Sequence, residues 1–334
     1  MKPKYKMNTG KSIFIWLLTL SAFSQLLACQ HKGDYKTTEG MIWNTLYHIT
    51  YNGPESLKDS ILPTLNNVGK SLSVFDKGSL VSLLNESDSV QADHHLITVF
   101  KESEKIYSLS NGRFDPTLGP LIDAWGFGRG HNPRPDTLFV DSIMTFVGMD
   151  KTHLKGTVII KYDPRVSFNF SAIAKGYGCD AVGEMLRRNN VFDYMVEIGG
   201  EISLRGKSPT GVDWKIGIDA PEEGKSPGEK TLMVLSLTDC GIATSGNYRN
   251  FHEEGGSKQV HTISSKTGRP FSSEILSATV ISSSCMEADA LATACMAGSL
   301  HDAMQLLESS GAEGMLVLAD STYFTPGFTK FIRE

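Results

Sequence analysis

The chain has 334 residues, a formal net charge of −5, 40% hydrophobic residues and 21% charged residues. This composition is ordinary for a globular protein, and the sequence contains no long low-complexity tract and no convincing internal repeat. Because there is no large basic excess, the composition gives no support to a nucleic-acid partner.

The N-terminus is predicted to be an export signal. Four lysines precede the apolar run at 12–23, which is too short to span a bilayer. The stretch that follows, Leu26 to Cys29, resembles the lipobox of bacterial lipoproteins, in which cleavage leaves Cys29 as a lipidated N-terminal residue. An ordinary signal peptide with an incidental cysteine is the alternative. We therefore expect a signal peptide at 1–28, a polar tether at 29–39 and an exported, membrane-anchored protein.

Residues 40–334 provide enough chain for one large domain or for two lobes that share a core. Alternating β-formers predict a strand at 41–51, and apolar residues at helical spacing predict a helix from Leu57 to Leu72. A second helix is predicted at 94–112. Strands outnumber helices and do not alternate regularly with them, which favours an α+β fold over a doubly wound sheet. The later predictions are a hairpin at 156–170 turning at Asp163-Pro164, a helix at 171–188, strands at 193–206, 213–220, 230–245 and 277–284, a helix at 286–298 and a closing hairpin at 314–332.

Four cysteines follow the export signal and its Cys29. They show no C-x-x-C spacing, so a structural zinc site is not indicated. A disulfide is possible in an oxidising compartment, but four small buried thiols are the interpretation that we favour. These residues are Cys179, Cys240, Cys285 and Cys295.

The helix at 286–298 combines small apolar residues with two oxygen-bearing side chains. Ser284 and Glu287 fit a capping box, which explains the glutamate. Asp289 and Thr293 lie four positions apart on one face, and a buried carboxylate without a partner is costly. Mg²⁺ commonly takes only one or two protein oxygens and completes its shell with phosphate and water, so a metal site is one hypothesis. A solvent-facing aspartate with a threonine bonded back into its helix is the alternative.

Lys175 falls in the first turns of the predicted helix at 171–188, where a cation opposes the helix dipole. An anion bound at the helix N-terminus, as phosphates often are, would account for this placement. Gly176 and Gly178 would allow close approach, and the glycines of 197–201 would let a backbone approach a ligand or another strand. A lysine that simply reaches solvent is the alternative.

Three further segments offer polar or aromatic groups beside glycines. Asp115 and Pro116 are predicted as the N-cap and first residue of a helix. The pair Trp125 and Phe127 suits stacking on a planar ring, although such aromatics are more often part of a core. His261 stands among hydroxyl-bearing residues, although a lone histidine is more often structural. The sequence has neither an ordinary P-loop nor a G-x-G-x-x-G after a strand, so no Rossmann site is indicated.

In their order along the chain, these segments resemble the ApbE family, the FAD:protein FMN transferases. The resemblance covers nearly the whole chain after the signal peptide. The segments that carry it are GMIWNTLYHI, GRFDPTLGPLIDAWGFG, AIAKGYGCD, VEIGGEISLRG, GIATSGNYRNF, HTISSKTGRP and ADALATACMAG.

The resemblance implies an ApbE-like α+β fold with mixed or antiparallel sheets flanked by helices and two lobes that share a central nucleotide cleft. It implies Mg²⁺ held by the Asp289 carboxylate, the Thr293 hydroxyl and the backbone carbonyl of Ala172. Lys175 would lie on the FAD phosphates and His261 would act as the base, so that these two and Asp289 are the catalytic candidates. The other positions that match the family's nucleotide-binding stretches are Met41, Phe75, Asp115, Trp125, Gly126, Phe127, Asn169, Ser245, Tyr248 and Ile263.

The implied reaction is Mg²⁺-dependent transfer of FMN from FAD to a threonine or serine hydroxyl of a target flavoprotein, with release of AMP. A Mg²⁺-dependent FAD pyrophosphatase and a non-catalytic FAD-binding lipoprotein are the alternatives. The resemblance also implies acceptors among the flavin-carrying subunits of electron-transfer complexes, on the periplasmic side of the inner membrane. The chain departs from the family pattern at Ser264-Ser265 and Asn169, where acidic residues are usual, and at Phe75, where tyrosine is common.

Overall fold

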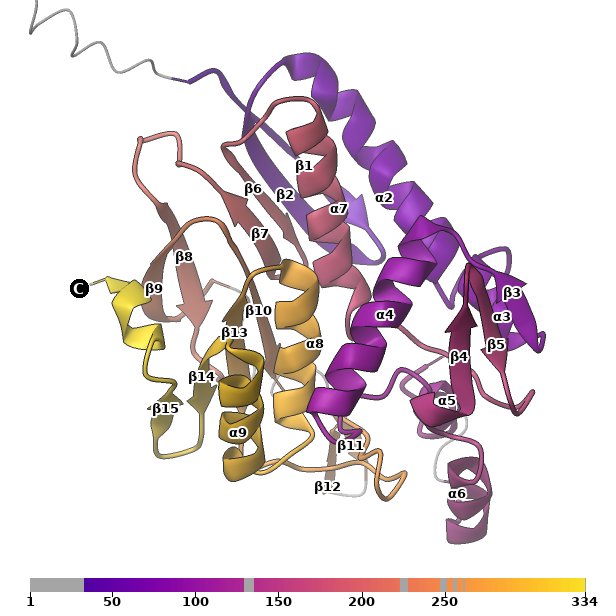
Figure 1. The fold of residues 1–334 in the computed structure, drawn as a ribbon. Coiled ribbons are helices and arrows are strands. Elements are labelled where there is room, and N and C mark those ends of the chain that lie inside the picture. The colour runs from indigo at the N-terminus through magenta and orange to yellow at the C-terminus, as the bar shows by residue number, and fades with distance from the viewer. Residues whose placement is uncertain are drawn as a thin grey trace, which may run out of the picture. The chain divides into compact units, whose positions relative to one another are not determined.

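An antiparallel sheet forms the main layer of the fold (Figure 1). The computed structural model describes residues 33–128, 135–222, 228–246, 251–254, 257–260 and 262–333. Within these ranges the main sheet has eight strands, and each adjacent pair is antiparallel. Their order is β1 (Tyr35–Ile42), β2 (Thr45–Asn52), β6 (Tyr194–Ile198), β7 (Glu201–Arg205), β10 (Cys240–Gly246), β13 (Ser277–Ser282), β14 (Glu313–Val317) and β15 (Thr322–Phe324).

Three smaller sheets complete the strands of the described ranges. One has the order β16 (Ile332–Arg333), β9 (Thr231–Leu237) and β8 (Trp214–Asp219); a second has β3 (Ser89–Gln91), β5 (Val158–Lys161) and β4 (Thr152–Lys155); and β11 (Phe251–Glu254) pairs with β12 (Ser257–Val260).

Helices cover one face of the main sheet. Figure 1 shows α7 (Ala174–Arg188) and α8 (Cys285–Met296) in front of it, where α7 contacts β6 and β7, and α8 contacts β10 and β13. The remaining helices are α2 (Lys58–Leu72), α3 (Leu80–Asn85), α4 (His94–Leu109), α5 (Gly119–Ala124), α6 (Thr137–Met144) and α9 (Leu300–Ser310), with short 3₁₀ turns η1 (Glu55–Leu57), η2 (Met149–Lys151) and η3 (Phe328–Phe331).

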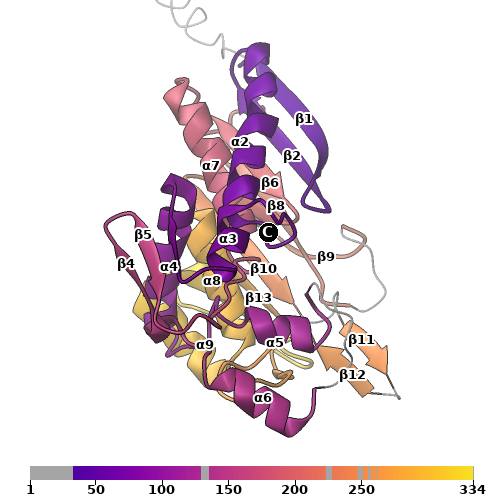
Figure 2. The ribbon, with the colours of Figure 1, turned by 90° about the vertical axis from the view of Figure 1, so that its right-hand side faces the viewer.

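The central strands of the main sheet are buried on both faces because their side chains alternate between two hydrophobic clusters. On β10, Ile242 packs with residues of β8 and β9, whereas the adjacent Ala243 packs with the helices. On β13, Ile281 packs in the cluster on the β8 and β9 side, and Val280 packs in the cluster on the helix side. In the turned view of Figure 2, α4 and α7 lie to the left of the sheet and β9 to its right. The result is a helix layer, a main sheet and a second small sheet around two cores.

The predicted α+β class with antiparallel sheets flanked by helices is confirmed. Residues Tyr35–Glu334 form one compact unit. Within the described residues no helix is both long and apolar enough to cross a membrane. The four cysteines that follow the signal are free thiols in these ranges, and three of them are buried.

Several predicted strands are hairpins instead. The predicted strand at 41–51 contains the turn between β1 and β2, where Trp43 and Asn44 adopt positive φ angles of 50° and 60°. Because β1 begins at Tyr35, the last five residues of the predicted tether at 29–39 belong to the sheet. The predicted strand at 193–206 likewise turns at Gly199 and Gly200, whose φ angles are 67° and 103°.

Other predicted element boundaries also differ from those in the structure. The hairpin predicted at 156–170 turns at Gly156 (φ 63°) rather than at Asp163-Pro164, because β4 and β5 precede that dipeptide. The predicted strand at 230–245 is β9 followed by β10, which belong to different sheets. The closing hairpin is confirmed as β14 and β15, and the predicted stop after α4 is confirmed by positive φ at Asn111 and Gly112.

Candidate active site

The first turn of α7 lies against α8 at a glycine. A Cβ atom on Gly176 would lie 2.8 Å from the Cβ of Asp289 and still closer to the backbone carbonyl of Cys285. No larger residue fits this position without moving one helix, which confirms that Gly176 permits close approach. The contact brings the carboxylate of Asp289 to the start of α7.

Each of these helices supplies a carboxylate to the N-terminus of the other. Asp289 Oδ2 accepts a hydrogen bond of 3.0 Å from the Gly176 amide, in a helix whose own N-cap residue provides no side-chain cap. In return, Asp180 of α7 accepts from the amides of Cys285 (3.1 Å) and Met286 (2.8 Å). Amide groups in a first helical turn have no intrahelical acceptor, so these carboxylates satisfy them. Asp289 is 3% exposed, so the solvent-facing alternative for it is wrong.

Glu287 forms half of the predicted capping box. Ser284 is the N-cap of α8 and accepts from the Glu287 amide at 3.1 Å. The Glu287 side chain does not return to the N-cap, because it accepts hydrogen bonds from Lys105 (2.5 Å) and Ser283 (3.2 Å) instead.

Lys175 is held by a carboxylate that the sequence analysis did not single out. Its Nζ lies 2.6 Å from Oε1 of Glu201, the first residue of β7, and the glutamate is 5% exposed. Lys175 therefore pairs with a buried carboxylate, while 33% of its own side chain stays exposed. One signal was available in the sequence: Glu201 is an acidic residue directly after Gly199-Gly200, at the start of a strand that enters the core.

The two carboxylates and one ammonium group carry a net negative charge when all are ionised. Burial raises the pKa of Asp289 above its ordinary value. Burial and the Asp289 charge raise the pKa of Glu201 to about 7, although Lys175 opposes the shift. Burial lowers the pKa of Lys175, but the two carboxylates raise it by more, so the lysine stays protonated. An additional cation would balance this cluster.

The donor atoms present fit a hard cation. Asp289 contributes a carboxylate, and the Thr293 hydroxyl on the same helix lies 3.3 Å from the Ser245 hydroxyl at the end of β10. Ala172 lies in the turn that leads into α7. The described residues contain no group of three or more His, Cys, Asp or Glu side chains that could hold a metal. A cation here would need oxygens from phosphate and water, as Mg²⁺ commonly takes.

Comparison with known proteins identifies the family of the chain. The model of the ApbE family matches residues 43–316. The chain belongs to the ApbE family. It is 32% identical to the FAD:protein FMN transferase of Vibrio cholerae, with 91% of this chain and 93% of the relative covered. It is 30% identical to the enzyme of that name from Haemophilus influenzae, with 96% and 97% covered.

Solved ApbE structures share the fold. The flavin transferase ApbE from Vibrio cholerae superposes with a TM-score of 0.80 at 30% identity, covering 89% of this chain and 99% of that one. The apo form of the Pseudomonas stutzeri flavinyl transferase ApbE gives a TM-score of 0.80 at 27% identity, covering 89% and 96%. The resemblance inferred from the sequence motifs is confirmed.

The ApbE positions expected to line a flavin or adenine fall into two groups in the structure. Met41 and Phe75 are 69% and 70% exposed, so their side chains are available to a ligand. Trp125, Phe127 and Ile263 instead pack together in a small core with α5 and α6, and Trp125 Nε1 donates a 2.7 Å hydrogen bond to the Gly268 carbonyl. Trp125 and Phe127 are only partly buried there, whereas Ile263 is buried.

Polar ApbE positions shape the turns that lead into the site. Asp115 is not the N-cap of α5, which begins at Gly119; its Oδ1 accepts from the amide and hydroxyl of Thr117 in a tight turn. Asn169 Oδ1 accepts from the Ser171 amide at 2.9 Å, in the turn before α7. Gly126 has a φ of 81° at the end of α5, a conformation that favours glycine.

Three predicted functional residues lie outside the described residues. They are Cys29, Tyr248 and His261.

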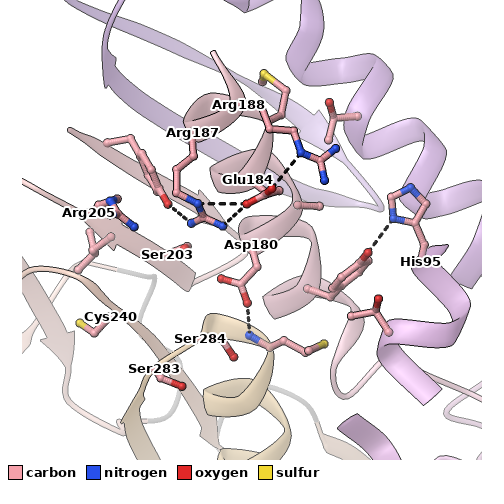
Figure 3. Close-up of a pocket in the computed structure, with 18 of the residues that line it drawn as sticks. His95, Asp180, Glu184, Arg187, Arg188, Ser203, Arg205, Cys240, Ser283 and Ser284 are labelled. Carbon is pink, nitrogen blue, oxygen red and sulfur yellow. Dashed lines mark hydrogen bonds and ion pairs between the residues drawn. The ribbon is translucent and has the colours of Figure 1, made fainter. Parts of the chain in front are cut away.

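The cavity shown in Figure 3 is a separate feature. It has a volume of about 570 Å³ and opens on the other side of α7, where none of Lys175, Glu201, Asp289 or Thr293 lines it. Some of its charged groups already have partners: Glu184 binds both Arg187 (2.6 Å) and Arg188 (2.9 Å), and Asp180 caps α8 as described above. This cavity is therefore not the candidate active site.

Proposed function

We propose that this protein is an FAD:protein FMN transferase, which moves FMN from FAD to a threonine or serine hydroxyl of a target flavoprotein and releases AMP. Relatives of that name share about a third of their residues with it over some nine tenths of the chain. The observation that carries the proposal is the buried Asp289 carboxylate, which meets the first turn of α7 beside Lys175.

The residues of the site have separate tasks in this reaction. Asp289, Thr293 and the Ala172 carbonyl would hold Mg²⁺, which neutralises charge on phosphate oxygens in phosphoryl transfer. Lys175, fixed at the N-terminus of α7, would bind the FAD phosphates, where the helix dipole also favours an anion. Positioning and charge neutralisation supply most of the rate in such reactions.

The bond changes balance as a displacement at phosphorus. The acceptor hydroxyl oxygen forms a bond to the FMN-side phosphorus, and the bond from that phosphorus to the bridging oxygen breaks. Its electron pair leaves with AMP, and the hydroxyl proton passes to a base. His261 is our candidate for that base because it heads the matching family motif. A general base contributes about 10²–10⁴-fold to such a rate.

One incubation tests the reaction class. The chain without its signal peptide is mixed with FAD, Mg²⁺ and a flavoprotein that carries an acceptor threonine. Covalent flavin fluorescence on the acceptor supports transfer, whereas free FMN indicates a pyrophosphatase and unchanged FAD indicates binding alone. Loss of a metal ligand should lower the rate of FMN transfer at least as much as loss of a general base does. We therefore expect Asp289→Ala to reduce the transfer rate by more than about 10²-fold at limiting Mg²⁺.

The matched control is Glu308→Ala, which removes an exposed carboxylate from α9 and should leave the rate unchanged. A wild-type rate for Asp289→Ala at limiting Mg²⁺ would show that the metal assignment is wrong.

The location of the reaction forms a further part of the proposal. The lipobox-like stretch ending at Cys29 supports export and attachment to the periplasmic side of the inner membrane. The acceptors would then be flavin-carrying subunits of electron-transfer complexes that face the same side.

A further inference from the structure

The backbone of Glu201 is fixed on two sides. It pairs with Ile198 across the β6–β7 hairpin, and its carbonyl accepts a 3.1 Å hydrogen bond from the Cys179 thiol on α7. The Gly199-Gly200 turn that precedes it uses positive φ angles that other residues rarely adopt. A Cβ on Gly199 would also lie only 2.9 Å from the Thr45 hydroxyl, so a larger residue fits poorly at this position. The Glu201 side chain therefore leaves the sheet from a defined position.

Within the described part of the chain, the Glu201 carboxylate has a hydrogen-bond partner for only one of its two oxygens. Oε1 binds Lys175, but Oε2 is buried and has no hydrogen-bond partner among the described residues. An unsatisfied buried acceptor costs about 1–3 kcal/mol, more when it is charged. A donor from outside the described residues, such as a bound water molecule, would satisfy this oxygen.

The neighbours of Glu201 identify the kind of donor. Lys175, which binds Glu201, is followed directly by Gly176, whose amide binds Asp289. The two carboxylates thus bind adjacent residues of α7, and Asp289 is the proposed Mg²⁺ ligand. Mg²⁺ usually keeps several of its waters, and each of these waters needs an acceptor. A free carboxylate oxygen beside the metal site is such an acceptor.

We propose that Glu201 is a positioning residue of the transfer site: Oε1 holds the Lys175 ammonium group, and Oε2 accepts a hydrogen bond from a water molecule on the cation held by Asp289 and Thr293. The inference rests on the Mg²⁺ site of the proposed function. It gives one side chain two tasks, since it fixes both positive charges that face the FAD phosphates.

Manganese binding tests this role without measuring activity. Mn²⁺ is titrated into the chain without its signal peptide, with FAD present and acceptor absent, and free Mn²⁺ is followed by electron paramagnetic resonance. Glu201→Gln keeps the shape of the side chain and removes its charge. Outer-shell partners typically change metal affinity 10–100-fold, so we expect about this loss of Mn²⁺ affinity. The control is Glu197→Gln, on β6 of the same hairpin, whose carboxylate binds His48 and should not affect Mn²⁺.

Repeating the Glu201→Gln titration in a Lys175→Met protein separates the effect on the cation from the effect on the lysine. If the glutamate acts on the cation itself, Glu201→Gln should still weaken Mn²⁺ binding when Lys175 is replaced by Met. If it acts only by holding the lysine, the effect should vanish in Lys175→Met, and the water-binding role is overturned. A purely structural role would lower the melting temperature and leave Mn²⁺ affinity unchanged, which would also overturn the inference.

Asp289→Asn distinguishes failure of the inference from failure of the metal site. If this variant loses Mn²⁺ affinity while Glu201→Gln binds Mn²⁺ like the wild type, only the role of Glu201 is wrong. If Asp289→Asn also binds Mn²⁺ like the wild type, the metal site itself is misplaced and the inference is overturned with it.

Discussion

Asp115 carries a buried carboxylate whose ionisation opposes folding. Burial raises its pKa to about 6, and the nearby charge of Asp150 adds to the shift, although hydrogen bonds from Thr117 oppose it. An aspartate in an unfolded chain has a pKa of about 3.9. The native state therefore binds this proton more tightly than the unfolded state does. Its contribution to stability is fully present below about pH 4 and is lost as the pH rises through about 6.

We expect Asp115→Asn to remove this dependence. The asparagine Oδ1 can still accept from Thr117, but it cannot ionise. A shift of roughly two pKa units corresponds to about 3 kcal/mol, so the variant should gain up to that much stability over the wild type between pH 4 and pH 7. Urea unfolding at several pH values measures the difference. The exposed Asp141→Asn on α6 is the control, and a constant difference between wild type and Asp115→Asn across the range would refute the assignment.

At the scale of single residues, local spacing predicted some of the site but not all of it. The spacing singled out Asp289 and Thr293 as candidates because two polar groups four positions apart are conspicuous in an apolar helix. Glu201 was missed because its partner, Lys175, is 26 positions away and is brought near only when α7 packs on β7. The prediction of Asp115 as a helix N-cap was wrong because an Asp-Pro dipeptide suits a tight turn as well as a helix N-terminus.

At the scale of elements, the crossing of α7 and α8 determines whether the site can form. Gly176 sets the separation of the two helices, and the exchanged carboxylates Asp180 and Asp289 fix their positions along each other. The sequence identified both helices and the need for close approach at the glycine. The sequence did not reveal that each helix caps the other, because a capping residue that is distant in the sequence leaves no local pattern.

We expect Gly176→Ala to destabilise the protein and to weaken the metal site. The added Cβ would overlap the Cys285 carbonyl, and overpacking of this kind costs about 1–3 kcal/mol, against a gain of about 1 kcal/mol in helix propensity. Urea unfolding should show a net loss, and Mn²⁺ titration should show weaker binding. The control is Gly217→Ala on β8, where the new Cβ would lie an ordinary 3.6 Å from Thr231. Unchanged stability and unchanged Mn²⁺ affinity in Gly176→Ala would mean that the helices tolerate more separation than the contact implies.

At the scale of the whole molecule, the candidate site is built on the main sheet and on the two helices that pack against it. Glu201 begins β7 and Ser245 lies on β10, two neighbouring strands of the main sheet, while α7 and α8 pack on the same sheet. Elements held on both faces keep a catalytic group in place better than a loop does. Composition and element order predicted the α+β class. The pairing of β9 with β8 in a second sheet, rather than with β10, could not be predicted, because it depends on contacts between distant strands.

If the proposed lipid anchor at Cys29 holds the protein on the membrane, replacing that one residue should release it. Each buried acyl CH₂ contributes about 0.8 kcal/mol, so several chains on one cysteine give a stable anchor that a single substitution removes. We expect Cys29→Ala to move the protein from the membrane pellet to the soluble fraction after ultracentrifugation, while transfer to a soluble acceptor continues. Cys240→Ala, which alters the least buried of the described thiols, should stay in the pellet. If Cys29→Ala remained fully in the pellet, the protein would have to be held there by another segment or by a partner.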